Sequence, residues 1–260
     1  MKKVIVVSFQ RSGTHFLINT LSTNFVGIDD GWVDIIHEKE NRWVKEVSPH
    51  NFKDKIYEQL LKVYYPSPFK KCLKTHYQVY FFEHYLEEII GKYDIFYMIR
   101  DPRDVMVACY HYYNNTNFEQ FIKEPDFSRF LRRELWDVRT ETQPFSYSQV
   151  KPRNIVDKWN NHVLSWLPYK DKGVTFIRFY DLKARLEQTL RYIVSRSQQR
   201  LKEIIQPITV EDKRYRPDFI KPGLERGAVG VWTDYFTEDD LRFVEDIVPE
   251  DIRQITYSPS

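Results

Sequence analysis

Cysteine, glycine and charge of one sign are all scarce in this sequence of 260 residues. Its two cysteines, Cys72 and Cys109, cannot form a network of disulfides, and alone they cannot supply the four ligands of a structural zinc site. Its 39 Lys and Arg nearly balance 37 Asp and Glu, which leaves a net charge of +2. An extended surface for nucleic acid or a membrane is therefore not expected, and a cationic site has to be local.

Long hydrophobic runs are missing as well. No stretch approaches 18 apolar residues, so no membrane span is predicted. The apolar run at residues 4–7 is too short for the core of a signal peptide. Together with the low cysteine content, these absences predict a cytoplasmic protein.

Apolar and aromatic residues are plentiful, at 42% and 16% of the chain, and they indicate a compact globular protein. A length of 260 residues suffices for a sizeable core, so we expect a single domain over residues 1–260. The 18 Tyr and 18 Phe fit either a ring-rich core or a ring-walled ligand pocket, and composition does not choose between the two.

Short apolar runs that are typical of buried strands alternate with segments of helical spacing. The predicted strands cover residues 4–7, 70–76, 94–99 and 174–179. The predicted helices cover residues 53–65, 81–90, 102–113, 155–167, 180–200 and 238–246, and another begins near residue 16. Segment 29–50 is expected to be irregular or to form short helices, and segment 114–154 is expected to be the least regular part of the chain. This order predicts an α/β fold, with a central parallel sheet flanked by helices.

The turn after the first strand has the composition of an anion-binding loop. A strand, a tight turn and a helix aim backbone N–H groups and a helix N-terminus at a bound anion. Arg11 adds a fixed positive charge, and Ser12, Thr14 and His15 add side-chain donors. A Walker A loop is excluded, because its second Gly and its Lys are absent. An ordinary strand-to-helix connection remains the alternative.

Polar residues also follow two other predicted strands. Lys74 and His76 end the second strand, and Arg100 and Asp101 follow the third, where Asp101 before Pro102 predicts the start of a helix. Parallel sheets bind ligands at the carboxyl ends of their strands, so we expect one site there.

This predicted set of side chains suits a ligand with several anionic groups. It contains almost no carboxylates to hold Mg²⁺, so metal-free transfer of an anionic group is preferred to an ATP-dependent kinase. His76 is the one member that can act as a base near neutral pH.

Five segments, in order along the chain, resemble the motifs of the cytosolic-type sulfotransferases. They are R-S-G-T-H-F at residues 11–16, K-T-H at 74–76, R-D-P-R-D-V through Y-H-Y-Y at 100–113, F-Y-D-L-K at 179–183, and R-G-x-V-G-x-W with F-T at 226–237. The resemblance implies transfer of a sulfuryl group from 3′-phosphoadenosine 5′-phosphosulfate to a hydroxyl or amine of a small molecule, without a metal. Adenosine 3′,5′-bisphosphate is the implied product, and a P-loop-like turn is the implied phosphosulfate-binding loop.

The resemblance also assigns residues to roles. His76 would take the proton of the acceptor, Lys74 would hold the transferring sulfonate, and Arg11 would stabilise the departing phosphate. The implied cofactor-binding residues are Arg11, Ser12, Gly13, Thr14, His15, Phe16, Arg100, Tyr180, Arg226 and Gly227, with Arg100, Arg226 and Gly227 at the 3′-phosphate.

Several positions depart from the family pattern. Arg11 stands where Lys is usual, Ala108 replaces a Ser that binds the 3′-phosphate, and Glu225 stands where Arg is usual. These departures keep open the alternative of a nucleotide-binding protein on the same fold that does not catalyse.

The acceptor is a small molecule that the sequence does not identify. The residues expected to line its site are Tyr77, Tyr80, Phe81 and His111. A homodimer is compatible with the sequence.

Overall fold

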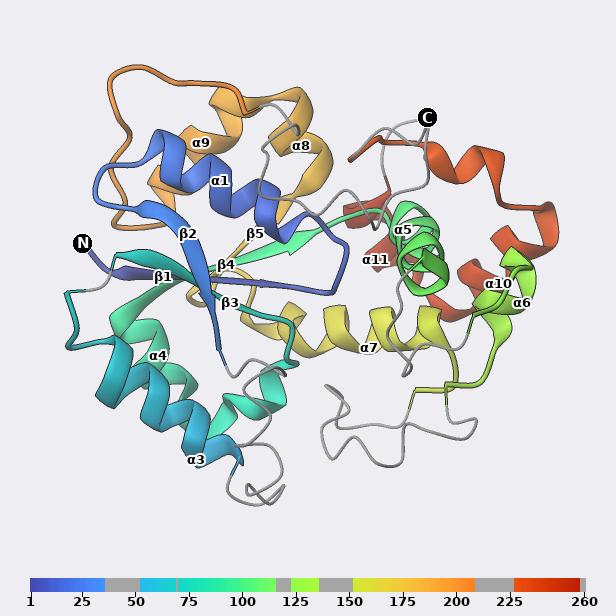
Figure 1. Cartoon of the computed structure of the whole chain (residues 1–260), viewed down its shortest axis with the longest axis horizontal. Coiled ribbons are helices and arrows are strands. Elements are labelled where there is room, and N and C mark those ends of the chain that lie inside the picture. Colours follow the sequence, from blue (N-terminus) through green and yellow to red (C-terminus); the bar gives the residue numbers. More distant parts are fainter. Residues whose placement is uncertain (36–51, 69, 116–122, 136–151, 209–226, 258–260) are drawn as a thin grey trace.

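The computed structural model of the chain describes residues 1–35, 52–68, 70–115, 123–135, 152–208 and 227–257. Its centre is a five-stranded sheet with the strand order β2-β3-β1-β4-β5, in which every neighbouring pair is parallel (Figure 1). The strands are β1 (Lys3–Ser8), β2 (Asp29–Asp34), β3 (Lys71–Thr75), β4 (Tyr93–Ile99) and β5 (Val174–Arg178). The predicted α/β fold with a central parallel sheet is confirmed.

Helices cover both faces of the sheet (Figure 1). One face carries α1 (Thr14–Asn24), α8 (Phe179–Ala184) and α9 (Leu186–Ser195). The other face carries α3 (Phe52–Tyr57), a π-helical segment that continues it (Glu58–Tyr64), α4 (Leu86–Lys92) and α7 (Ile155–Trp166). Helices α5 (Pro102–Asn115), α6 (Phe127–Arg132), α10 (Glu238–Ile247) and α11 (Glu250–Thr256) gather on the side toward which the strands run.

One apolar core lies on each face of the sheet, and the side chains of β1 point alternately into the two cores. Val4 and Val6 pack with side chains of α1 and α9, whereas Ile5 and Val7 pack with side chains of α4, α5 and α7. Because both faces are buried, β1 and β4 read as continuous apolar runs, which is why the sequence predicts them well.

Some expected elements differ from the structure. Strand β2 lies within 29–50, which was expected to be irregular. Because β2 is an edge strand whose residues are at most partly buried, it carries no apolar run. The predicted helix 81–90 is wrong in its first part, where the single turns Val79–Phe81 and Glu83–Tyr85 precede α4. Helices α6 and α11 were not predicted.

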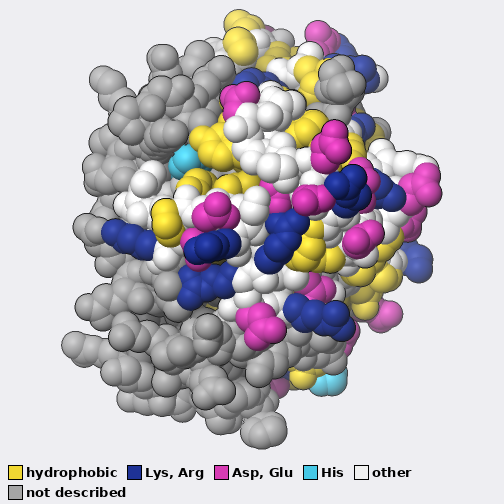
Figure 2. Space-filling view, turned by 90° about the vertical axis from the view of Figure 1, so that its right-hand side faces the viewer, with side chains coloured by type: hydrophobic (Ala, Val, Ile, Leu, Met, Phe, Trp, Pro, Cys, Tyr) yellow, Lys and Arg dark blue, Asp and Glu magenta, His cyan; other side chains and the backbone are white. Residues whose placement is uncertain are grey.

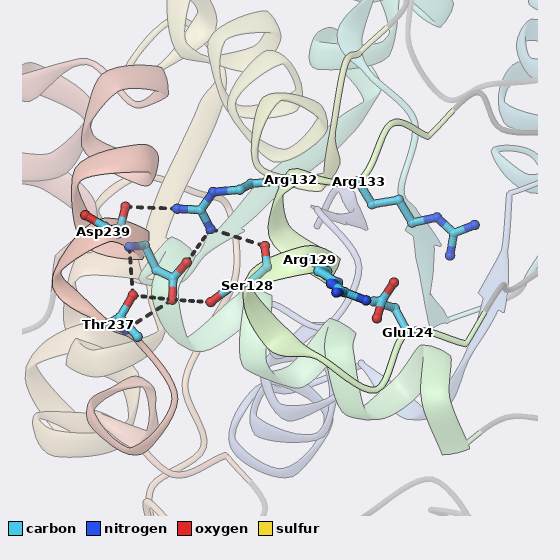
Figure 3. A pocket seen from close by; sticks show the side chains of 8 residues that line it. Glu124, Ser128, Arg129, Arg132, Arg133, Thr237 and Asp239 are labelled. Carbon is cyan, nitrogen blue, oxygen red and sulfur yellow. Dashed lines mark hydrogen bonds and ion pairs between the residues drawn. The ribbon is translucent and has the colours of Figure 1, made fainter.

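The start of α10 is joined to α6 by one buried carboxylate. Asp240 accepts hydrogen bonds from Thr237 N at 3.1 Å, from Ser128 Oγ at 2.8 Å and from Arg132 (Figure 3). Thr237 Oγ1 in turn accepts from Asp240 N at 3.2 Å, which completes a capping box. Burial by itself would raise the pKa of Asp240, but the hydrogen bonds from Arg132, Thr237 and Ser128 outweigh it and lower the pKa.

Replacing this carboxylate is expected to destabilise the fold. Asp240→Ala should lower the free energy of unfolding at pH 7 by about 2–4 kcal/mol, because it leaves several donors unpaired. In the wild type the lowered pKa means that this contribution is full above pH ~4 and is lost as pH falls through the folded-state pKa. Urea denaturation between pH 3 and 7 measures both effects.

The matched control is Asp239→Ala. The Asp239 side chain is 76% exposed, so its loss should change stability by less than about 0.5 kcal/mol. Equal effects of the two substitutions would contradict the assignment of Asp240 as the joint between α6 and α10.

Candidate active site

The first part of the site is the turn between β1 and α1. Ser12 N donates to Phe9 O at 3.3 Å, and Leu17 N donates to Gly13 O at 3.1 Å, which starts the helix. Ser8 Oγ and Thr14 Oγ1 lie 2.6 Å apart and are buried, so they tie the end of the strand to the first turn of α1. The turn therefore presents the N-terminus of α1 at the carboxyl end of β1.

Two residues of this turn have left-handed backbone conformations. Gly13 has φ of 96°, and a Cβ at this position would lie 2.4 Å from the ring of Phe179. Arg11 has φ of 64°, a conformation that costs a non-glycine residue about 1 kcal/mol or more. Its guanidinium lies 5.0 Å from the centre of the Tyr112 ring. The turn is thus a specific, strained shape and not an ordinary connection.

Several donors at this turn are buried without a partner in the described part of the chain. They are Arg11 Nε, Ser12 Oγ and Arg100 Nε. A buried polar group that makes no hydrogen bond costs roughly 1–3 kcal/mol, so such groups gathered at one turn call for a ligand. Since the arginine nitrogens are cationic and the helix N-terminus favours negative charge, an anion fits here.

Lys74 brings an ammonium group to the same edge of the sheet. Its Nζ lies 2.6 Å from Asp34 Oδ1 on the neighbouring strand and 3.4 Å from His15 Nε2 on α1. Asp34 is a functional candidate that the sequence analysis missed, because it lies in a segment expected to be irregular. The expectation that this set contains almost no carboxylates is therefore too simple.

His15 sits against Lys74 in an uncharged state. Burial and the charges of Lys74, His76 and Arg11 lower the pKa of His15 well below its usual value. Its ring lies 4.1 Å from the ring of Trp32, measured between centres. A neutral imidazole has one acceptor nitrogen, so Nε2 can accept from the ammonium of Lys74.

His76 has a defined tautomer and an available base nitrogen. Its Nδ1 lies 2.7 Å from the carbonyl oxygen of Ser8, which can only accept, so Nδ1 carries the hydrogen. The lone pair of the neutral ring is then on Nε2. Burial and the nearby charge of Lys74 lower the pKa of His76 to about 4. The ring is therefore neutral at physiological pH.

A second histidine fixes the backbone of the first. His162 on α7 donates from Nε2 to the carbonyl oxygen of His76 at 3.1 Å, and its Nδ1 accepts from the hydroxyl of Tyr97 at 2.8 Å. Burial and the charge of His76 lower the pKa of His162 to about 3, so it too is neutral. His162 lies in a helix that the sequence predicts, but no local sequence pattern singles it out for a role.

Arg100 links the turn to the C-terminal part of the chain. It donates from Nη1 to Arg11 O at 3.2 Å and from Nη2 to Ala228 O at 2.8 Å. In the first turn of α5, Asp104 accepts from Gly230 N at 3.1 Å and from Trp232 N at 3.3 Å. These bonds hold the segment that follows Gly227 beside the β1–α1 turn.

The prediction of a capped helix start is also confirmed nearby. Asp101 accepts from Arg103 N at 3.0 Å just before α5 begins at Pro102. The guanidinium of Arg103 pairs with Asp101 at 2.7 Å and lies between the rings of Trp232 and Tyr257. Arg103 is thus committed to structural contacts.

The structure places the remaining predicted residues as follows. Phe16 lies 5.6 Å from Phe179 between ring centres, and Tyr180 is half-buried at the start of α8. Lys183 Nζ donates to the Gly227 carbonyl at 3.0 Å. Arg226, like Glu225, lies outside the described residues.

The residues predicted to line the acceptor site are spread over several environments. Tyr77 and Phe81 are buried in the core on the side of α7, whereas Tyr80 is half-buried with Lys53 Nζ 3.4 Å from its ring centre. His111 Nε2 on α5 hydrogen-bonds the hydroxyl of Tyr235 at 2.7 Å.

A separate cleft of about 650 Å³ lies between α6 and α10 (Figure 3). Its lining residues are Glu124, Ser128, Arg129, Arg132, Arg133, Thr237, Asp239 and Asp240, and none of them belongs to the site at the strand ends. On the coloured part of the face seen in Figure 2, Lys and Arg lie among Asp and Glu and form no field of one sign. None of the described helices combines the length and the apolar character needed to cross a membrane.

Comparison with known proteins gives one family. Residues 1–256 match the family model described as "Sulfotransferase domain". The chain is 22% identical to rat sulfotransferase 2A1 over 191 residues, which cover 73% of this chain and 57% of that protein. It is 25% identical to sulfotransferase 2A1 of Macaca fascicularis over 205 residues, which cover 78% of this chain and 60% of the relative. The chain thus spans less than two thirds of the length of these curated relatives.

Solved structures show the same fold. Mouse sulfotransferase SULT7A1 complexed with PAP matches with a TM-score of 0.56 at 20% identity, over 95% of this chain and 83% of that one. Retinol dehydratase in complex with retinol and PAP matches with a TM-score of 0.54 at 18% identity, over 99% of this chain and 83% of the other.

The need for glycine in the turn can be tested directly. Gly13→Ala should destabilise the protein by about 1–3 kcal/mol, because the residue has positive φ and the added Cβ overlaps the Phe179 ring. The matched control is Gly91→Ala, at an open position in α4, which should be neutral or stabilise by up to about 1 kcal/mol. Thermal unfolding measures the stability of both variants. An equal change in stability would show that the turn tolerates a side chain at position 13.

The neutral state of His76 can be measured by NMR. The imidazole signals should show that His76 stays neutral down to pH 5 and titrates near its pKa of about 4, because burial and Lys74 disfavour the charged ring. Its resonances are assigned by their loss in His76→Gln. A titration midpoint at pH 6 or higher would contradict the described environment.

Proposed function

The chain belongs to the sulfotransferase domain family, and from this premise we propose that it transfers a sulfuryl group from 3′-phosphoadenosine 5′-phosphosulfate to a hydroxyl or amine of a small-molecule acceptor. The observation that carries the proposal is the set of buried donors without partners at the β1–α1 turn, beside Lys74 and His76. This set fits the 5′ end of the donor, which is anionic and needs several hydrogen bonds at once.

The β1–α1 turn would hold the phosphosulfate. Arg11 Nε and Ser12 Oγ are buried and lack partners in the described chain, and Thr14 starts the helix whose N-terminus faces the turn. The donor, when bound, supplies the sulfuryl group and carries away an electron pair on its departing phosphate. Arg11 offsets that charge with a guanidinium already held in place by its backbone and by Tyr112.

His76 acts as the general base of the proposed reaction. Its Nε2 lone pair can accept the proton of the acceptor hydroxyl or amine, since Nδ1 already donates to Ser8 O. In the free protein Lys74 helps to keep its pKa low. A bound anion offsets the charge of Lys74 and so strengthens the base at the stage when it is needed.

Lys74 and Arg100 would supply two further positive charges for the bound donor. Lys74 Nζ, on β3, is held two residues before His76, so it can donate to the sulfonate while the base faces the acceptor. Arg100 binds the carbonyls of Arg11 and Ala228 and has its Nε without a partner in the described residues, which supports a role at the 3′-phosphate. Arg226 and Gly227 keep the predicted role at that phosphate.

The acceptor is a small molecule with a hydroxyl or amine. The solved relative that was crystallised with retinol shows that this fold also holds a hydrophobic alcohol. Half-buried Tyr80, and buried His111 with its hydrogen-bond partner, half-buried Tyr235, are the polar-tipped rings that we propose for orienting the acceptor.

The proposal is tested with the wild type and His76→Ala. Wild-type protein should form sulfated product, detected by mass, only with the phosphosulfate donor and not with ATP and Mg²⁺. His76→Ala should lower turnover by about 10²–10⁴-fold, the usual contribution of a general base. Calorimetry should find binding of PAP (adenosine 3′,5′-bisphosphate) within threefold of the wild type, because the base does not hold the nucleotide.

The control is His84→Ala, which removes an exposed imidazole and should retain full turnover. Normal turnover in His76→Ala would disprove the base assignment. Tight PAP binding by the wild type without product from any hydroxyl or amine would favour a non-catalytic nucleotide-binding protein instead. Phosphorylation that depends on ATP would revive the kinase alternative.

A further inference from the structure

We propose that Asp34 is a positioning residue, which fixes the ammonium group of Lys74 for contact with the transferring group; this inference rests on the proposed function. Asp34 Oδ1 lies 2.6 Å from Lys74 Nζ, and the two side chains are 21% and 11% exposed. An ion pair so enclosed is screened far less than one on the surface, so it can hold a flexible lysine in one place.

The strand register places the two residues opposite each other. Asp34 pairs with Lys74 across β2 and β3, as Val33 pairs with Leu73 and Trp32 with Cys72. The register shifts between Asp29 and Trp32, where Gly31 has φ of 87°. If the register of Asp29 opposite Lys71 continued without this shift, Trp32 and not Asp34 would face Lys74. The irregularity in β2 therefore brings the carboxylate to the lysine.

The hydrogen bonds of Lys74 leave room for a ligand. An ammonium group has three N–H donors. One points to Asp34 at 2.6 Å and one to His15 Nε2 at 3.4 Å. Two fixed contacts define the direction of the third donor, which is the one that we assign to the sulfonate. The ion pair with Asp34 thus holds the ammonium group of Lys74 in place and leaves one of its N–H donors for the ligand.

The charges around Lys74 explain why a carboxylate is needed. Arg11 from the β1–α1 turn is cationic, while His15 from α1 and His76 after β3 are neutral at pH 7. The aromatic ring of Trp32 has its centre 5.5 Å from Lys74 Nζ. Asp34 is therefore the negative charge that faces the ammonium among the described residues, and it offsets the cost of burying that charge.

The test compares Asp34→Asn with the matched control Asp29→Asn. Both remove one carboxylate from β2 without changing the shape of the side chain, but Asp29 is exposed and sits opposite Lys71. With ¹³Cε-labelled lysine, the two Cε protons of Lys74 should give separate signals in the wild type, because the side chain is held. They should merge in Asp34→Asn and stay separate in Asp29→Asn. Lys74→Arg assigns the signals.

Kinetics supply the second readout. In Asp34→Asn kcat should fall about 10–100-fold, because the uncharged amide oxygen holds the ammonium group much less firmly than the carboxylate does. KM for the donor should not rise, because removing a negative charge does not weaken the binding of an anion. Asp34→Glu should recover most of kcat, since it restores the charge, and Asp29→Asn should match the wild type.

Two results would overturn the proposal: separate Cε signals in Asp34→Asn, or a kcat of that variant within twofold of the wild type. If Asp34→Asn fails to fold, Asp34→Glu takes its place as the test. The proposal requires that this variant keep the separate Cε signals and the turnover, and loss of either would overturn it. Failure of the proposed function can be distinguished from failure of the role proposed for Asp34. A wild type without sulfuryl transfer would disprove that function, while the Cε signals, recorded without any donor, would still show whether Asp34 holds Lys74.

Discussion

The parallel pairing of β1 with β3 and β4 is the constraint on which the site depends. Ser8 pairs with Met98 and Val7 with Thr75, so these strands end within a residue or two of each other. Both faces of the sheet are covered by apolar cores, so β1 and β4 are mostly apolar along their length, and the polar side chains of the site lie at this edge. The anion-binding turn comes from one part of the chain and the lysine with the base from another, and this register brings them together.

Charge at this edge is balanced from within the protein. Lys74 is paired with Asp34, Arg103 with Asp101, and Arg100 donates to the carbonyls of Arg11 and Ala228. Buried cations are stable only with such partners. The donors that lack partners among the described residues, Arg11 Nε among them, are then the groups that a bound anion would satisfy.

The parts of the site that the sequence predicted are those with a local cause. The apolar runs of β1 and β4 and the Asp101-Pro102 start of α5 each follow from neighbouring residues, and all are confirmed. Asp34 and His162 were missed because their contacts join segments far apart in sequence. Asp34 faces Lys74 only because the register shifts within an edge strand, and His162 differs from a core histidine only by the carbonyl it reaches. Neither the register shift nor the contact of His162 can be predicted from sequence periodicity.

The proposed base and the proposed sulfonate ligand are coupled electrostatically. Burial and Lys74 keep the pKa of His76 near 4, so in the free protein the ring is neutral but weakly basic. Asp34 offsets part of the charge of Lys74, and a bound anion would offset more of it, which raises the proton affinity of His76. On this proposal the base becomes effective only after the donor is in place. Because Lys74 and His76 are this close, the proposal makes proton removal from the acceptor follow donor binding.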